Sequence, residues 1–99
     1  MVLEKIHQDL EQAVRQKDQD GKRTLRYLLA AIHNLEIALL LAPQGKKITD
    51  EQVIEVINRL IKTHKESIEA FKAGGREDLV KKEEKELAIL KKYLEVLNG

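Results

Sequence analysis

The chain has 99 residues, carries a formal net charge of +1 and contains no cysteine. This length predicts a single domain with a modest core. The composition, 42% hydrophobic and 35% charged with one proline, is typical of a folded helical protein rather than a disordered one. Aromatic residues, at 3%, are too few for the stacking platforms of single-strand nucleic-acid binding proteins. The lack of cysteine excludes disulfides, thiolate nucleophiles and zinc–thiolate sites.

Neither the N-terminal sequence nor the longest apolar stretch indicates secretion or a membrane span. The N-terminal sequence MVLEKIHQDLEQ is charged from Glu4 onward and does not resemble a secretory signal peptide. The longest apolar stretch, IALLLAP at 37–43, is too short to span a bilayer. Together with the lack of cysteine, these features predict a cytoplasmic protein without membrane contact.

Apolar residues recur at helical spacing in four successive segments, and no segment alternates with period two as a strand would. The sequence KDQDG at 17–21 favours a turn after the first segment, and Pro43 with Gly45 ends the second. The pattern predicts an all-α, four-helix domain with short loops and antiparallel neighbours. We expect the helices over about residues 2–18, 22–41, 49–73 and 77–97.

The third segment carries a start signal and a stop signal. In ITDEQV, Thr49 is expected as the N-cap and Gln52 as its partner in a capping box. Gly74 is expected to end the helix as a left-handed C′ residue, with Gly75 reversing the chain. A phosphate-binding nest is the alternative for Gly-Gly-Arg, but the acidic pair at 77–78 occupies the positive end of the next helix.

The end of the second segment, IALLLA at 37–42, is apolar on nearly every face. A helix that lacks a polar face is either central to a fold or covered by a partner. This stretch therefore predicts an interface with another protein or with a second copy of the chain. The candidate interface residues are Ile37, Leu39, Leu40 and Leu41.

Few residues suggest chemistry. The histidines, His7, His33 and His64, fall on three different helices, where a lone histidine is more often packed than ligating. No metal-binding spacing and no set of nucleophile, base and orienting residue can be assembled, so we expect no metal ion, cofactor or catalytic residue. Glu83 interrupts the apolar stripe of the fourth helix and is expected in a structural ion pair. Its candidate partners are Arg23, Arg26 and Lys65.

Basic residues concentrate at both ends of the second helix, where residues 21–47 hold five basic side chains against one acidic one. Twenty helical residues span about 30 Å, so two small patches are favoured over one groove. An elongated RNA could reach both patches through its phosphates, whereas solvated surface charge is the alternative. The candidate nucleic-acid contacts are Arg23, Arg26, Lys46, Lys47 and Arg76.

Three stretches carry a family resemblance: LEKIHQDLEQAVRQKD at 3–18, TLRYLLAAIHNLEI at 24–37, and residues 48–94 with KESIEAF, GREDLV and KEEKELAIL. They closely resemble the YqeY-like family of the GatB/YqeY group, in order and over essentially the whole chain. The resemblance implies a helical domain similar to the one near the C-terminus of the B subunit of the glutamine-dependent tRNA amidotransferase. In that enzyme the helical and tail regions help hold the misacylated tRNA, while amide transfer occurs elsewhere.

The resemblance therefore implies a non-catalytic accessory module associated with tRNA or with a tRNA-amidotransferase complex. The family often carries an amidotransferase-type, carbon–nitrogen ligase-like label, but no active site is carried over with it. The alternative is a protein-interaction or oligomerisation module that uses residues 37–41 and has no nucleic-acid role.

Two departures from the family pattern bear on these alternatives. Family members usually continue after YLP into a smaller helical tail, whereas this sequence reads YLEVLNG, with Glu95 in place of the proline. The portion that would resemble the tRNA-contacting tail is thus expected to be missing. The family also commonly has charged residues where this chain has NLEIALLLAPQG. Apolar residues at 39–41 in place of charge suggest a covered surface, such as a dimer contact.

Overall fold

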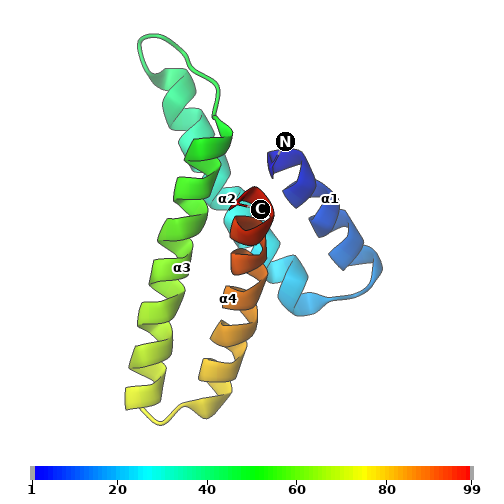
Figure 1. The fold of residues 1–99 in the computed structure, drawn as a ribbon, viewed down its shortest axis with the longest axis vertical. Helices are drawn as coiled ribbons and strands as arrows, with labels where there is room; N and C mark the ends of the chain where they lie inside the picture. The colour runs from blue at the N-terminus through cyan, green and yellow to red at the C-terminus, as the bar shows by residue number, and fades with distance from the viewer. Residues whose placement is uncertain (1, 99) are drawn as a thin grey trace.

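The computed structural model describes the backbone of residues 2–98 and the side chains of residues 2–95. These residues form α1 (Val2–Arg15), α2 (Gln19–Leu41), α3 (Asp50–Ala73) and α4 (Glu77–Asn98), and within them there is no strand. The helices α3 and α4 form a long antiparallel hairpin, α2 runs obliquely across it, and α1 packs against α2 (Figure 1). The predicted all-α, four-helix fold is confirmed.

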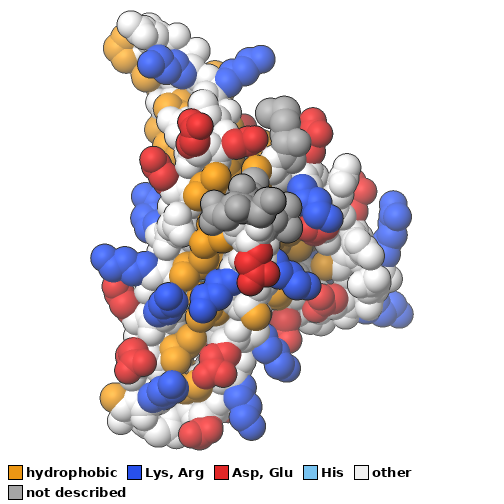
Figure 2. Space-filling model, in the orientation of Figure 1, with side chains coloured by type: hydrophobic (Ala, Val, Ile, Leu, Met, Phe, Trp, Pro, Cys, Tyr) orange, Lys and Arg blue, Asp and Glu red, His pale blue; other side chains and the backbone are white. Residues whose placement is uncertain are grey.

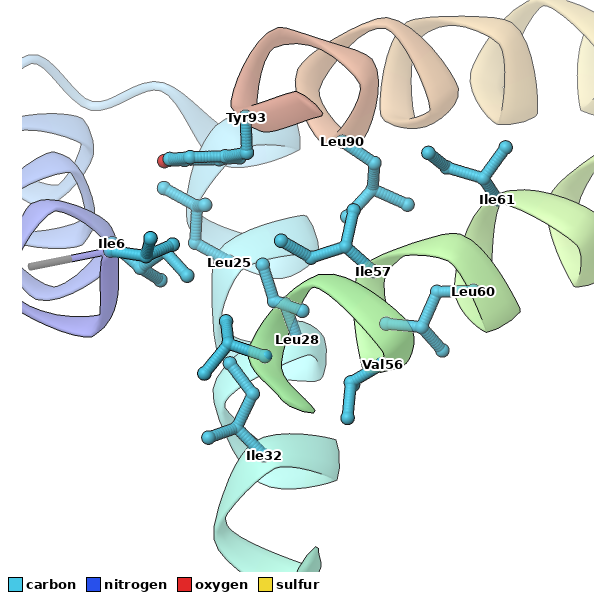
Figure 3. Packing of buried hydrophobic residues seen from close by; sticks show 12 residues of the cluster. Ile6, Leu25, Leu28, Ile32, Val56, Ile57, Leu60, Ile61, Leu90 and Tyr93 are labelled. Atoms are coloured by element: carbon cyan, nitrogen blue, oxygen red, sulfur yellow. The ribbon is translucent and has the colours of Figure 1, made fainter. Parts of the chain in front are cut away.

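The core is built around the first and middle turns of α2. Leu25, Leu28 and Ile32 are buried and lie among side chains from the three other helices (Figure 3). These positions fall at the helical spacing of the apolar residues, so each helix contributes one stripe to a common centre. The neighbouring side chains include Ile6 of α1, Val56 and Ile57 of α3, and Leu90 of α4.

The turn between α1 and α2 differs from the prediction. The helix α1 ends at Arg15 and α2 begins at Gln19, each three residues before the expected boundary. Lys17 adopts a left-handed φ of 57°, and the Asp18 carboxylate accepts a hydrogen bond from the Gly21 N–H at 3.0 Å. Asp18 is therefore the N-cap of α2. Gly21 lies inside the first helical turn, where an added Cβ would collide with the capping carboxylate.

The start of α3 agrees with the prediction. The Thr49 hydroxyl oxygen accepts a hydrogen bond from the Gln52 N–H at 3.2 Å, and the Gln52 side-chain oxygen accepts one from the Thr49 N–H at 2.9 Å. This reciprocal pair is the capping box. Two N–H groups at the exposed end of α3 thus gain acceptors within the chain.

The end of α3 is shifted by one residue from the prediction. Gly74 has a φ of −86°, whereas Gly75 has a φ of 71° and is the left-handed residue. The Arg76 N–H donates to the Phe71 carbonyl at 2.9 Å, and the Gly75 N–H donates to the Lys72 carbonyl at 3.1 Å. These two bonds form a Schellman motif, which sets the second glycine in the left-handed position.

Of the helices within residues 2–98, α2 alone is long and apolar enough to cross a membrane by length and composition. This is weak evidence, because a core helix of a bundle passes the same test. Leu28 and Ile32 are completely buried against the other helices and account for part of the apolar character. Exposed apolar residues near the C-terminal end of α2 account for another part.

The capping box yields a test of the α3 boundary. Thr49→Ala is expected to lower the free energy of unfolding by about 1 kcal/mol, because the Gln52 N–H loses its acceptor. Urea unfolding followed by circular dichroism measures the change. Thr63→Ala is the matched control, since this hydroxyl donates to the Arg59 carbonyl within α3 and caps no helix end. A change in the control as large as that in Thr49→Ala would contradict the capping role.

Candidate functional site

A cleft of about 270 Å³ lies where the N-terminal half of α2 meets the α3–α4 hairpin. Three helices line it, so its shape depends on the register of the hairpin as well as on the position of α2. Its side chains include two cations, Arg23 and Lys82, together with two carboxylates, a histidine and a serine. The lining residues include Arg23, Tyr27, His64, Ser67, Glu83 and Glu86.

His64 is the buried centre of this cleft, with a side chain that is 8% exposed. Its Nδ1 atom lies 2.9 Å from the Leu60 carbonyl oxygen one turn earlier on α3. Because a carbonyl oxygen can only accept, Nδ1 carries the hydrogen and donates it. The Tyr27 ring meets the imidazole edge-on, with the ring centroids 6.5 Å apart. The second ring nitrogen, Nε2, is therefore the atom that faces α4.

Two carboxylates of α4 face this nitrogen. The His64 Nε2 atom lies 3.4 Å from Oε2 of Glu83 and 3.5 Å from Oε1 of Glu86. Residues three apart on a helix share a face, which brings both carboxylates to the same side of α4. The second oxygen of Glu86 lies 3.6 Å from the Arg23 guanidinium, which also pairs with Asp20 at 2.7 Å. Arg23 thus holds Glu86 with one oxygen toward α2 and the other toward the histidine.

Glu83 therefore meets a different neighbour from those expected. The break in the apolar stripe predicted a partly buried carboxylate in an ion pair, and the side chain is 23% exposed beside His64. Of the three expected cations, Arg23 reaches the neighbouring carboxylate on α4 instead. The ion pairs formed among residues 2–95 include neither of the other two. The apolar pattern identified Glu83 as a partly buried carboxylate. Its neighbour, His64, is set by the register of α3 against α4, which the pattern does not contain.

The cleft does not place a nucleophile against a base. Ser67 lies one turn after His64, yet no hydrogen bond joins the two side chains among the described residues. The Nε2 atom faces carboxylates instead of the hydroxyl, so the histidine is not set up to remove the serine proton. The other two histidines, His7 and His33, are exposed rather than packed, because they lie on the outer faces of α1 and α2.

The five predicted nucleic-acid contacts do not gather into one surface. Arg23 is held between acidic side chains, as described above. Arg76 donates from Nε and a terminal nitrogen to Asp78 at 3.4 and 3.3 Å. These hydrogen bonds lower the pKa of the Asp78 carboxyl group. The other three candidates, Arg26, Lys46 and Lys47, are exposed and take part in none of the ion pairs among residues 2–95.

The C-terminal end of α2 and the loop after it project beyond the other helices (Figure 1). Three side chains there are exposed apolar groups, Ile37 at 42%, Leu40 at 63% and Leu41 at 80%. These three residues are called the apolar end of α2 below. Leu39, the fourth interface candidate, is half-buried, and its carbonyl accepts the Lys46 N–H that closes the loop. Figure 2 shows hydrophobic and basic side chains together at this projecting end.

A second cleft, of about 480 Å³, lies between α1, the start of α2 and α4. The Tyr93 hydroxyl donates to the Asp9 carboxylate at 2.6 Å, and the other oxygen of Asp9 lies 3.1 Å from the Lys5 ammonium. Burial of the phenol and the adjacent carboxylate both raise the pKa of Tyr93. Tyr93 therefore acts as a neutral donor that joins α4 to α1. The sequence analysis above does not predict this contact, although Tyr93 lies three residues after Leu90 and so falls on the apolar face of α4.

The raised pKa of Tyr93 predicts a loss of stability at alkaline pH. The folded state holds this phenol neutral, whereas the unfolded state ionises near the ordinary pKa of about 10. The stabilisation is therefore complete below about pH 10 and is lost progressively as the pH rises above it. The Tyr27→Phe variant keeps Tyr93 as its one tyrosine. Its tyrosinate absorbance should appear at a higher pH in the native protein than in the urea-unfolded protein.

The matching stability measurement uses Tyr93→Phe. This variant should lose less stability than the wild-type chain between neutral and alkaline pH, because no buried phenol is left to ionise. Coincident tyrosinate titrations of native and urea-unfolded Tyr27→Phe would contradict the interpretation.

Comparisons with known proteins identify relatives over almost the whole chain. The family model described as "Yqey-like protein" matches residues 3–96. A Saccharomyces cerevisiae (strain YJM789) protein named "Altered inheritance of mitochondria protein 41, mitochondrial" is 40% identical over 89 residues, covering 90% of this chain and 46% of that protein. Proteins of the same name from Lachancea thermotolerans and Eremothecium gossypii are 39% and 35% identical, covering 90% and 96% of this chain and 46% and 50% of those proteins. The chain spans about half the length of the curated relatives it matches.

The predicted cytoplasmic location is contradicted by these relatives, whose names describe them as mitochondrial. The features used for that prediction could not have separated the two locations. A lack of cysteine does not distinguish one reducing compartment from another. A charged N-terminal stretch argues against a secretory signal but says nothing about other targeting signals.

Proposed function

This chain belongs to the YqeY-like family, and we propose that it is a non-catalytic binding module that contacts another protein through the apolar end of α2. The observation that carries the proposal is the exposure of Ile37, Leu40 and Leu41 on a projecting helix. Residues at these spacings share one helical face. A cluster of large apolar side chains left in water on one face is typical of a protein interaction surface.

The energetics favour coverage of this surface by apolar side chains. Burying one leucine side chain contributes about 1.5 kcal/mol or more to association. The gain from Leu40 and Leu41 must exceed the cost of lost translational and rotational freedom, so the contact has to extend to neighbouring side chains. Half-buried Leu39 and the loop that follows α2 supply such neighbours.

Site-specific crosslinking in cells that express the chain tests this proposal. A photoreactive amino acid at position 40 should form a discrete protein adduct, because the partner covers this side chain. The same group at Val14 is the control, since that residue is also an exposed apolar side chain, at 47%, but lies on α1. Leu41→Asp in the position-40 protein should reduce the adduct, while Val14→Asp should leave it unchanged.

The adduct also reports which protein is bound. A dimer of this chain identifies a second copy, and sedimentation of the purified protein should then show self-association that Leu40→Asp abolishes. An adduct with a different protein identifies a heterologous partner. Equal crosslinking from positions 14 and 40, or none from position 40, would overturn the proposal.

Association with tRNA is a second candidate, implied by the resemblance to the amidotransferase B subunit. The observation that favours it is the exposure of Lys46 and Lys47 side by side in the loop beside the apolar end of α2. Two ammonium groups on a projecting loop can reach phosphate oxygens without rearrangement of the helices. Arg23 and Arg76 contribute less to this proposal, because each already has a carboxylate partner.

Filter binding of bulk tRNA over a range of salt concentrations tests this second candidate. Lys46→Glu/Lys47→Glu should weaken binding and reduce the slope of log affinity against log salt by about 2, one for each lost phosphate contact. Lys91→Glu/Lys92→Glu carries the same change of charge on exposed positions of α4 and is the control. Equal effects of the two variants would contradict a specific role of the loop. No affinity at low salt above that of a neutral protein would contradict tRNA binding altogether.

A further inference from the structure

We propose that His64, Glu83 and Glu86 form a binding site for one divalent transition-metal ion of the zinc type. The ligand atoms would be Nε2 of the histidine and one carboxylate oxygen of each glutamate, which all lie within 4.8 Å of one another. The histidine comes from α3 and both glutamates come from α4, so a bound ion would join the two arms of the hairpin. The sequence alone predicts no metal site, because the three ligands lie on two different helices and match no metal-binding spacing within one segment.

Three acceptor atoms lie close together in this cluster. The His64 Nδ1 hydrogen is donated to the Leu60 carbonyl, so a neutral imidazole has a lone pair on Nε2. The carboxylates of Glu83 and Glu86 lie beside that lone pair, and they also only accept when ionised. All three side chains line the open cleft, and a cation bound between them would accept the lone pair and offset both negative charges.

The two separations measured from the His64 Nε2 atom are longer than a charge-assisted hydrogen bond and near the spacing of zinc ligands. The Nε2 atom lies 3.4 and 3.5 Å from the two carboxylate oxygens. Charge-assisted N–H···O bonds are shorter, at about 2.7–2.9 Å. Ligands at about 2.0–2.1 Å from a tetrahedral zinc ion lie about 3.3–3.4 Å from one another, which is close to the observed separations. Neighbouring ligands around an octahedral magnesium ion lie closer, at about 3 Å.

The surrounding contacts resemble those that orient metal ligands. Metal-binding histidines commonly donate their other ring hydrogen to a carbonyl or carboxylate, as His64 does to Leu60. Ligating carboxylates are commonly held by a further side chain, as Glu86 is by Arg23. Arg23 also pairs with Asp20 at 2.7 Å, and Lys82 is a second cation in the lining of the cleft. Ser67 also lines this cleft.

The competing explanation is a proton on Nε2, which would make His64 an imidazolium between two carboxylates. Both explanations supply a positive species, but they differ in what the purified chain binds. A mixed imidazole and carboxylate set favours Zn²⁺ over Mg²⁺, which prefers oxygen ligands alone. A metal site therefore predicts selective, stoichiometric uptake of Zn²⁺, whereas an imidazolium predicts none.

Titration calorimetry of the chelator-treated chain with ZnCl₂ tests the proposal. We expect one Zn²⁺ per chain and no saturable binding of Mg²⁺. His64→Ala and Glu83→Gln should each weaken Zn²⁺ binding about tenfold or more. In the Co²⁺-loaded wild-type chain, a tetrahedral visible absorption spectrum is expected, and it should be lost in both variants.

Two controls separate this site from adventitious surface binding. His33→Ala removes an exposed histidine whose Nδ1 lies 3.9 Å from Glu36, and it should leave Zn²⁺ affinity unchanged. Glu84→Gln removes an exposed carboxylate next to Glu83 and should do the same. Zn²⁺ should also raise the thermal unfolding midpoint of the wild-type chain but not that of Glu83→Gln. No saturable Zn²⁺ binding, or equal binding by folded wild-type and His64→Ala proteins, would overturn the proposal.

Discussion

The burial of one stripe of α2, formed by Leu25, Leu28 and Ile32, is the constraint on which the rest of the structure depends. The helix α2 packs against each of the other three helices, and all of them gather around this stripe. Because the fully buried stripe ends at Ile32, nine residues before Leu41, the last turns of α2 extend past the core and expose Leu40 and Leu41 (Figure 1). The same packing sets Arg23 and Tyr27, which flank the stripe, against the α3–α4 hairpin. The core, the cleft and the projecting end thus follow from the placement of one apolar pattern.

The helices and the family could be predicted from the sequence because their signals are local. Apolar spacing identified the four helices, and the capping box located the start of α3 to the residue. The family was carried by long matching stretches, and the match over residues 3–96 confirms it. The sequence pattern gave the wrong helix boundary where two neighbouring residues could each have formed the cap. Between α1 and α2, Asp18 is the N-cap, so Gly21 lies inside α2 rather than in the turn. At the end of α3, the second of the two glycines, Gly75, is the left-handed residue.

The cleft was harder to predict because it is assembled across helices. Glu83 was recognised as a carboxylate in an apolar stripe, but its neighbour could not be deduced without the register of the α3–α4 hairpin. His64 lies nineteen positions earlier in the chain and meets Glu83 because the turn at Gly75 is short and the two helices are antiparallel. Helical spacing finds residues that share a face of one helix. It does not find residues that meet because two faces oppose each other, and the Tyr93–Asp9 contact was missed for the same reason.

The two proposed surfaces lie on parts of the molecule that the core keeps apart. His64 lies fifteen residues after Thr49, about 22 Å along α3 from the projecting loop. Between them the buried face of α3 packs against α2 through Val53, Val56 and Ile57. Close-packed side chains transmit a displacement only if the core itself shifts. Substitutions that share no partner and lie this far apart usually have additive effects. Coupling between a change at Leu40 and metal affinity at His64 would therefore indicate a rearrangement of α2 in the core rather than direct contact.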